Sequence, residues 1–171
     1  MGVIGPNIGV IGANIMSKEH IGVAVRVRPP LPEEEHDGPE CVRTEGGRLL
    51  LASPHRAKQF EIPVLLGPQC TQQEVFEAVG LPLVEDMFKG YSCALLAYGQ
   101  NRSGKTHSLR GGDSEESKGV VPRLVEHIAR KLQAEVRREV TYLMRVSYVE
   151  ISGEEVVDLL SVRKQAVGVG E

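Results

Sequence analysis

Residues 99–106 read Gly-Gln-Asn-Arg-Ser-Gly-Lys-Thr, and this spacing of two glycines, a lysine and a hydroxyl residue is suited to holding phosphate groups. Gly99 and Gly104 let the backbone turn tightly enough for successive N–H groups to face one anion. Lys105 is placed to reach the β- and γ-phosphates of a nucleotide, and the Thr106 hydroxyl can ligate the accompanying Mg²⁺. The sequence therefore predicts that the chain binds a nucleotide together with Mg²⁺.

The residues on either side of this loop give it the context that a phosphate-binding loop requires. The apolar run at residues 94–97 predicts a buried strand leading into the loop, and a helix is expected to begin near Lys105. The N-terminus of that helix adds the positive end of its dipole to the same spot. A glycine turn followed by a surface lysine is the alternative interpretation. We assign nucleotide binding to the whole loop, namely Gly99, Gln100, Asn101, Arg102, Ser103, Gly104, Lys105 and Thr106.

The composition describes an ordinary globular protein of one domain, or part of a larger one, in its 171 residues. A net charge of −3 gives no electrostatic reason to expect nucleic acid or an anionic membrane as a partner. The three cysteines are widely spaced, without a Cys-x-x-Cys pair, which favours a reduced intracellular compartment. The five histidines show no metal-ligand spacing.

The first fifteen residues contain a tandem repeat. Residues 2–8 read Gly-Val-Ile-Gly-Pro-Asn-Ile and residues 9–15 read Gly-Val-Ile-Gly-Ala-Asn-Ile, so the copies differ only at Pro6 and Ala13. Glycine at this density cannot sustain a helix, and Pro6 and the glycines interrupt the apolar run that a signal peptide needs. We expect residues 1–16 to be an extension outside the fold, with the folded domain in residues 17–171. The alternative is a short strand that pairs with the sheet edge of a partner.

The first half of the domain reads as strands followed by a helix. Residues 21–27 alternate as a strand that ends at Pro29-Pro30, and residues 31–40 are predicted to form an exposed loop. Residues 42–51 predict a hairpin about Gly46-Gly47. A further strand is expected within residues 59–66, at an edge or with a bulge because of Pro63.

The remaining elements complete an α/β pattern. Thr71 and Glu74 form the signature of a capping box, so a helix is expected to begin there, to kink or split at Gly80 and Pro82 and to end at Lys89-Gly90.

After the phosphate loop we expect a polar loop without regular structure at residues 110–118 and an amphipathic helix from about Pro122 to residue 136. A strand is predicted at residues 141–151 and a short helix or turn at residues 154–160. The order predicts an α/β sheet with the phosphate loop at the carboxyl end of a central strand.

Six blocks then narrow the interpretation. They are residues 25–29 (Val-Arg-Val-Arg-Pro), 67–76 (Gly-Pro-x-x-Thr-Gln-x-x-Val-Phe), 82–91 (Pro-Leu-Val-Glu-Asp-x-x-x-Gly-Tyr), 97–107 (Ala-Tyr-Gly-Gln-x-x-Ser-Gly-Lys-Thr-His), 119–123 (Gly-Val-Val-Pro-Arg) and 146–160 (Val-Ser-Tyr-x-Glu-Ile, then Asp-Leu-Leu). In this order they resemble the amino-terminal part of the kinesin motor domain. The resemblance implies a P-loop NTPase-type fold with a central, mostly parallel sheet flanked by helices.

The resemblance also implies a nucleotide site and partners. Arg26 and Pro29 would pack against adenine, and His107 would close the pocket from beyond the loop; a guanidinium, a proline ring and an imidazole are suited to sandwich a purine. The ligand implied is ATP or ADP with Mg²⁺, with Thr106 at the metal. Microtubules are the implied partner, in the cytoplasm and on the cytoskeleton.

The chain also departs from the family's pattern. The family's loop carries a threonine and a small residue where this chain has Asn101 and Arg102, and a bulky side chain at residue 102 strains the turn if that position needs a positive φ. The acidic residue usual on the second strand has no clear counterpart near residues 62–63. Neither of the family's γ-phosphate-sensing segments, Asn-x-x-Ser-Ser-Arg-Ser-His and Asp-Leu-Ala-Gly-x-Glu, occurs in residues 1–171.

Two functions follow as hypotheses. The first is a kinesin-like microtubule motor that binds ATP, and hydrolyses it in a complete parent protein; without the two segments we expect residues 1–171 alone to bind nucleotide without turning it over. The second is a non-catalytic, kinesin-derived structural module of a microtubule assembly. An unrelated P-loop kinase or GTPase is a third reading, although the Asn-Lys-x-Asp segment that a GTPase uses for guanine is absent.

Overall fold

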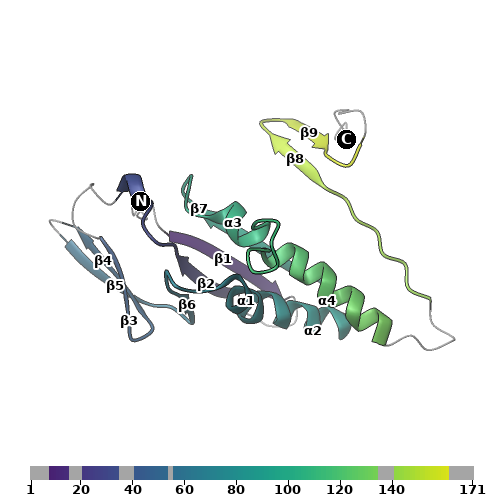
Figure 1. The fold of residues 1–171 in the computed structure, drawn as a ribbon, viewed down its shortest axis with the longest axis horizontal. Helices are drawn as coiled ribbons and strands as arrows, with labels where there is room; N and C mark the ends of the chain where they lie inside the picture. Colours follow the sequence, from purple (N-terminus) through teal and green to yellow (C-terminus); the bar gives the residue numbers. More distant parts are fainter. Residues whose placement is uncertain (1–7, 16–20, 35–40, 54–55, 135–140, 162–171) are drawn as a thin grey trace. The chain divides into compact units, whose positions relative to one another are not determined.

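A computed structural model describes residues 8–15, 21–34, 41–53, 56–134 and 141–161. The chain divides into two compact units, Met1–Ala134 and Glu135–Glu171, each of which is described by itself. The first unit carries the sheets and helices around the phosphate loop (Figure 1). The expected mixture of strands and helices is confirmed, and the protein belongs to the α/β class.

The main sheet has four strands in the order β6 (Val64–Leu66), β2 (Gly22–Val27), β1 (Ile8–Ile15) and β7 (Cys93–Gly99). β2 and β6 pair in parallel, and β1 runs antiparallel to both β2 and β7. β2, β6 and β7 therefore run in one direction and β1 in the other, so the sheet is mixed, with one parallel and two antiparallel pairings. The predicted strand at residues 21–27 is confirmed.

β1 corrects the expectation that residues 1–16 lie outside the fold. The second copy of the repeat forms a strand inside the main sheet, with backbone ladders to β2 on one side and to β7 on the other. Strand formation depends on the partners available to the backbone as well as on residue type, so two neighbouring strands outweigh the weak strand preference of glycine. Residues 1–7 and 16 lie outside the described residues.

The position of β7 is a second correction. Among the described strands β7 pairs only with β1 and stands at the end of the order, so the strand before the phosphate loop is not central. Its burial alternates, and Leu96 and Tyr98 are 67% and 68% exposed. The strand is therefore covered on one face only, where it was expected to be buried.

The helices cover one face of the main sheet (Figure 1). Thr71 caps α1 (Gln72–Val75), and the predicted capping box is present, since Glu74 N donates to Thr71 Oγ1 at 3.2 Å and Thr71 N donates to the Glu74 carboxylate at 2.7 Å. The predicted split occurs as a π-helical turn, η2 (Phe76–Gly80), followed by α2 (Leu81–Phe88). Gly90 ends α2 at a φ of +92°, as predicted.

Two further helices follow the phosphate loop and close the core. α3 (Lys105–Leu109) begins directly after the loop, and the predicted long helix is confirmed as α4 (Val120–Ala134). The core on the helical face joins one strand residue to the helices, through Ala24, Val75, Phe76, Val79 and Val120. This packing fixes α1, η2 and α4 against β2 and so fixes the frame around the site.

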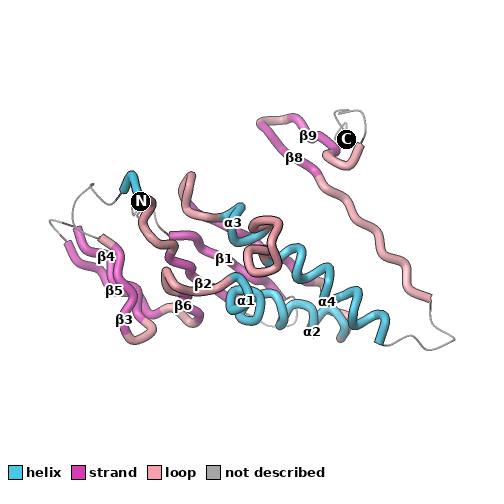
Figure 2. Tube along the Cα trace, in the orientation of Figure 1, coloured by secondary structure: helices cyan, strands magenta, loops and turns pink. Residues whose placement is uncertain are grey.

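The opposite face of β2 packs against a separate three-stranded sheet. Its strands are β3 (Val42–Glu45), β4 (Arg48–Ser53) and β5 (Arg56–Glu61), in that order (Figure 2). The predicted hairpin turn is confirmed, with Gly46 and Gly47 at φ values of +55° and +77°. Val25 and Val27 are buried with Val42 and Leu49. Residues 59–66 contribute to two strands where one was expected: Pro63 separates β5 from β6, and each stands at the end of its own sheet, in keeping with the edge position that Pro63 predicted.

The second unit differs from its prediction. The strand expected at residues 141–151 forms only from Val149, as β8 (Val149–Ser152), and residues 141–148 have no regular structure (Figure 2). The helix or turn expected at residues 154–160 is wrong over β9 (Glu155–Asp158), which pairs with β8 about Gly153 at a φ of +62°. Within the described residues no helix has the length and apolar character needed to cross a membrane.

Candidate nucleotide-binding site

The loop at residues 99–106 lies between the end of β7 and the start of α3, as its sequence predicts. Gly99 and Gly104 have φ values of +155° and +93°, which side chains rarely adopt. A Cβ added at Gly104 would meet nothing within 4 Å, so backbone conformation is the reason for glycine there. The Ser103 N–H donates to the Gln100 carbonyl at 3.2 Å and closes the turn.

Lys105 places its ammonium group over the same turn. Its Nζ donates to the carbonyls of Gly99 at 2.9 Å and Gln100 at 2.7 Å. These neutral acceptors are weaker partners for an ammonium than a phosphate, which carries charge. The first N–H groups of α3 have no acceptor within the helix, and its N-cap, Gly104, supplies no side-chain acceptor. The cation and the helix N-terminus are thus together at one turn.

Ser103 carries an unusual buried hydroxyl. The residue is 3% exposed, and its Oγ has no hydrogen-bond partner among the described residues. Buried hydroxyls are normally paired, because leaving one unpaired costs free energy. A loop with an unpaired hydroxyl, a lysine and a helix N-terminus directly after it fits an oxygen-rich anion such as a phosphate group.

Arg102 adopts a positive φ in this loop. Its φ is +63°, the left-handed conformation that costs a non-glycine residue about 1–2 kcal/mol. The sequence predicts strain at this position when its φ is positive, because arginine is bulky. The Asn101 side chain supports the turn by accepting from the Arg102 N–H at 3.1 Å.

Arg28 connects the loop to the end of β2. Its Nε donates to the Arg102 carbonyl at 2.9 Å, and its two terminal nitrogens bind both carboxylate oxygens of Glu34 at 2.7 and 2.6 Å. Glu34 belongs to η1 (Pro32–Glu34), a 3-10 turn inside the predicted exposed loop. Hydrogen bonds from Arg28, and then from the Leu31 N–H, lower the pKa of Glu34 to about 2. Sequence reasoning missed this pair; the only signal was the Arg-x-Arg-Pro segment.

Arg26 points to the helices. Its guanidinium donates to Gln72 Oε1 at 2.7 Å, to Ser108 Oγ at 2.9 Å and to the Cys70 carbonyl at 3.2 Å. Burial lowers the pKa of Arg26. The guanidinium therefore ties β2 to α1 and α3, and its hydrogen bonds serve this junction.

Gln72 completes the same junction. The residue is 4% exposed, and its Nε2 donates to the carbonyls of His107 at 2.7 Å and Ser117 at 3.1 Å. Sequence reasoning named Gln72 only as part of a helix entry, because nothing in its local pattern shows that a residue 35 positions away is its partner. Arg26 and Gln72 together hold the helix that follows the phosphate loop.

Pro29 and His107, the other two residues expected at adenine, are both exposed. Loss of solvation around the ring, and then the positive charge of Arg26, lower the pKa of His107. Thr106, expected at Mg²⁺, is exposed on the first turn of α3. Within the described residues no three His, Cys, Asp or Glu side chains gather as a metal site.

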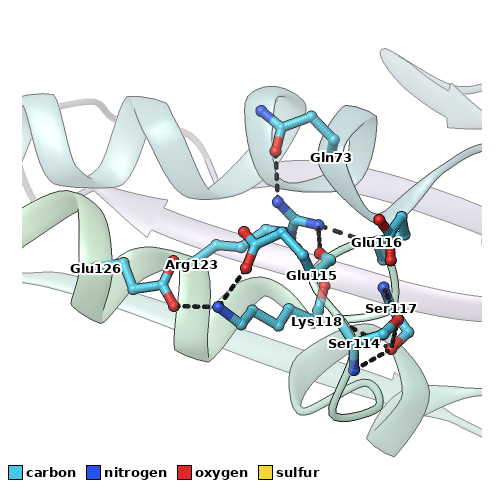
Figure 3. A network of polar contacts seen from close by, with 8 residues as sticks. All are labelled: Gln73, Ser114, Glu115, Glu116, Ser117, Lys118, Arg123 and Glu126. Carbon is cyan, nitrogen blue, oxygen red and sulfur yellow. Dashed lines mark hydrogen bonds and ion pairs between the residues drawn. The ribbon is translucent and has the colours of Figure 1, made fainter.

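The polar loop at residues 110–118 contains no helix or strand, as expected, and side-chain contacts tie it to the neighbouring helices. Figure 3 shows Arg123 reaching Gln73 of α1 and the Glu115 carbonyl, both at 2.6 Å. In the same view Lys118 bridges the carboxylates of Glu115 and Glu126 at 2.6 and 2.5 Å. Arg123 and Lys118 thus fasten the loop to α1 and α4. One cation, Lys118, belongs to the loop itself, and the other, Arg123, comes from α4.

Comparison with known proteins decides the family. The model of the kinesin motor domain matches residues 26–170. The chain belongs to the kinesin motor domain family. This kinesin chain is 35% identical over 159 residues to kinesin-like protein Klp61F of Drosophila melanogaster, covering 85% of the chain and 15% of that protein. It is also 35% identical over 147 residues to chromosome-associated kinesin KIF4 of Xenopus laevis, covering 82% of the chain and 12% of that protein.

Solved kinesin structures share the fold. The structure of a fast kinesin matches with a TM-score of 0.71 and 29% identity, over 80% of this chain and 39% of that one. A structure of KIF14 with ADP in complex with a microtubule matches with a TM-score of 0.66 and 24% identity, over 85% of this chain and 43% of that one. The kinesin chain described here therefore spans less than half of the solved motors and about an eighth to a seventh of the curated relatives named above.

Proposed function

We propose that the chain is the nucleotide-binding part of a kinesin-like microtubule motor, and that residues 99–106 bind the phosphates of ATP or ADP. The observation that carries the proposal is the turn between β7 and α3, where Lys105, the helix N-terminus and the unpaired Ser103 hydroxyl lie together. Family membership supports adenine over guanine nucleotides.

Each site residue has a role in this proposal. Lys105 leaves the loop carbonyls and binds the β- and γ-phosphates, while backbone N–H groups of the loop and of α3 bind the remaining oxygens. Thr106 ligates Mg²⁺, and the metal, when bound, neutralises charge on the phosphates. Pro29 and His107 bind adenine between them. Arg26 supports the site indirectly, because its hydrogen bonds hold α3 and His107 in place through Gln72 and Ser108.

The motor function belongs to the proposal as well. We assign microtubule binding, ATP hydrolysis and a place on the cytoplasmic cytoskeleton to a protein in which these residues are joined by the family's γ-phosphate-sensing segments. KIF14, whose fold this chain shares, was solved with ADP on a microtubule, which supports both the ligand and the partner.

The experiment is an equilibrium titration of the chain with a fluorescent ADP analogue, with and without Mg²⁺. Lys105→Ala should weaken binding at least about tenfold, or about 1.5 kcal/mol, because a charge-assisted contact to phosphate is lost. Lys58→Ala on exposed β5 is the matched control and should bind as the unaltered chain does. ATP should compete and GTP should compete poorly. Equal affinity of the Lys105→Ala and Lys58→Ala variants would contradict the assignment.

A further inference from the structure

The left-handed turn at Arg102 needs support from outside the loop. Within the described residues Arg102 is the only non-glycine residue with a positive φ, at +63°. A residue with a long side chain leaves this conformation unless its surroundings hold it there. The turn lies two residues before Gly104 and three before Lys105, so its conformation sets where the phosphate-facing groups stand.

The support comes from an ion pair between β2 and η1. Arg28 Nε donates to the Arg102 carbonyl at 2.9 Å, while Nη1 and Nη2 of Arg28 bind the two oxygens of Glu34. Glu34 is held in turn by the Leu31 N–H at 2.8 Å, and Arg28 Nη1 also donates to the Pro29 carbonyl at 2.9 Å. With both ends of the planar guanidinium fixed, Nε has a fixed direction.

The two side chains are shielded enough for the pair to be rigid. The side chains of Arg28 and Glu34 are 12% and 21% exposed. Lysine could replace the charge of Arg28 but not its geometry, because an ammonium cannot bind a carboxylate with two parallel bonds and aim a third donor at a carbonyl.

We propose that Arg28 and Glu34 are positioning residues for the phosphate loop: the pair holds the Arg102 carbonyl and thereby keeps the loop in its nucleotide-receiving turn. The proposal rests on the proposed function of the loop. Without the pair Arg102 relaxes to a negative φ, and the fraction of molecules with a competent loop falls. The apparent dissociation constant rises by the inverse of that fraction.

The first measurement is the dissociation constant of the fluorescent ADP analogue for Glu34→Gln and Arg28→Lys. Both variants should bind about tenfold more weakly than the unaltered chain. Glu61→Gln is the matched control, because Glu61 forms an exposed ion pair with Arg48 on β5 and β4, at 3.4 Å, away from the loop. Unchanged affinity of Glu34→Gln would overturn the proposal.

The second measurement separates positioning from general stability. Arg102→Gly placed in the Glu34→Gln chain should restore affinity to within about twofold, since glycine adopts a positive φ without steric cost. A pair that merely stabilises the fold would not be rescued by a glycine in the loop, so failure of the rescue would overturn the proposal.

The third measurement needs no nucleotide and so stands apart from the proposed function. In Glu34→Gln the backbone amides of residues 101–104 should exchange with solvent several-fold faster than in the unaltered chain, while those of the β3–β4 hairpin stay unchanged. Equal exchange in the loop would overturn the positioning role. Absence of nucleotide binding by the unaltered chain, with faster exchange in the variant, would refute the proposed function and leave the support of the turn intact.

Discussion

Residues 8–15 have a weaker sequence preference for strand than residues 141–151, yet residues 8–15 form a full strand and most of residues 141–151 do not. Residues 8–15 contain Gly9 and Gly12 yet form β1, with a strand on each side. Residues 141–151 alternate and are rich in valine, tyrosine and isoleucine, yet only the last three of them belong to a strand. The difference lies in the partners: β1 finds two ladders, and residues 141–148 find none among the described residues. Whether these residues form a strand therefore depends on whether a neighbouring strand is present to pair with their backbone.

The position of β1 matters to the proposed site because β1 joins β2 and β7, the two strands that carry the site residues. Gly9 of β1 lies opposite Arg26 of β2 on one side and opposite Gly99 of β7 on the other. The adenine side and the phosphate side of the proposed site are therefore coupled through one strand. This strand lies before residue 26, where the match to the kinesin motor domain begins.

Removal of residues 1–15 should produce the largest effect. β7 would lose the one strand with which it pairs among the described residues, and β2 would lose a full ladder. We expect a loss of about 5 kcal/mol or more in the free energy of unfolding, comparable with the whole stability of many domains, and loss of nucleotide binding. Denaturant unfolding and the ADP titration measure both.

This expectation reverses the one drawn from sequence, which placed residues 1–16 outside the fold and so predicts that the fold does not need them. A chain that starts at Met16 and melts within a few degrees of the full chain would restore the earlier view and would show that β7 does not need β1.

The parts of the fold that sequence predicted depend on neighbours a few residues apart. Thr71 and Glu74 carry their cap within one turn of helix, and Gly46-Gly47 carry their turn between the strands they join. The turn between β7 and α3 was predicted in the same way, since its glycines, Lys105 and Thr106 lie within eight residues.

The parts that sequence did not predict depend on partners far along the chain. β1 pairs with a strand more than 70 residues away, and the carbonyl that Arg28 binds is 74 residues away. Arg26 shows the same limit: the resemblance placed it against adenine, and its partners Gln72 and Ser108 were visible only in the folded chain. Sequence patterns therefore predict features whose residues lie close together in the chain, and contacts between distant residues are known only from the structure.

A smaller effect should follow from exchanging the one residue by which the repeat copies differ. Ala13 lies opposite Gly22 and Leu95, with a strand on each side, so Ala13→Pro removes a ladder donor. We expect a loss of about 1–3 kcal/mol in the free energy of unfolding, because a ladder hydrogen bond is lost and its acceptor is left without that donor. Because the first copy already carries Pro6, it cannot take the place of the second without the same loss.

Pro6→Ala is the matched control. It makes the two copies identical and so offers the sheet two registers of similar free energy, which should change stability by less than about 0.5 kcal/mol. If Ala13→Pro were as mild as Pro6→Ala in denaturant unfolding, β1 would not be a paired central strand in solution.

The smallest effect should come from the second unit. The same substitution, valine to threonine, tests this on β2 of the first unit and on β8 of the second. Val25 of β2 is 4% exposed and Val149 of β8 is 48% exposed, and valine to threonine changes the shape of neither. Val25→Thr buries a hydroxyl and should lower the free energy of unfolding by about 1–3 kcal/mol. Val149→Thr keeps the β-branched side chain on an exposed strand and should change it by less than about 0.5 kcal/mol. Denaturant midpoints of the two variants give the comparison directly. A loss at Val149 equal to that at Val25 would show that β8 is buried against a partner in solution. Lack of a partner would then not explain why residues 141–148 form no strand.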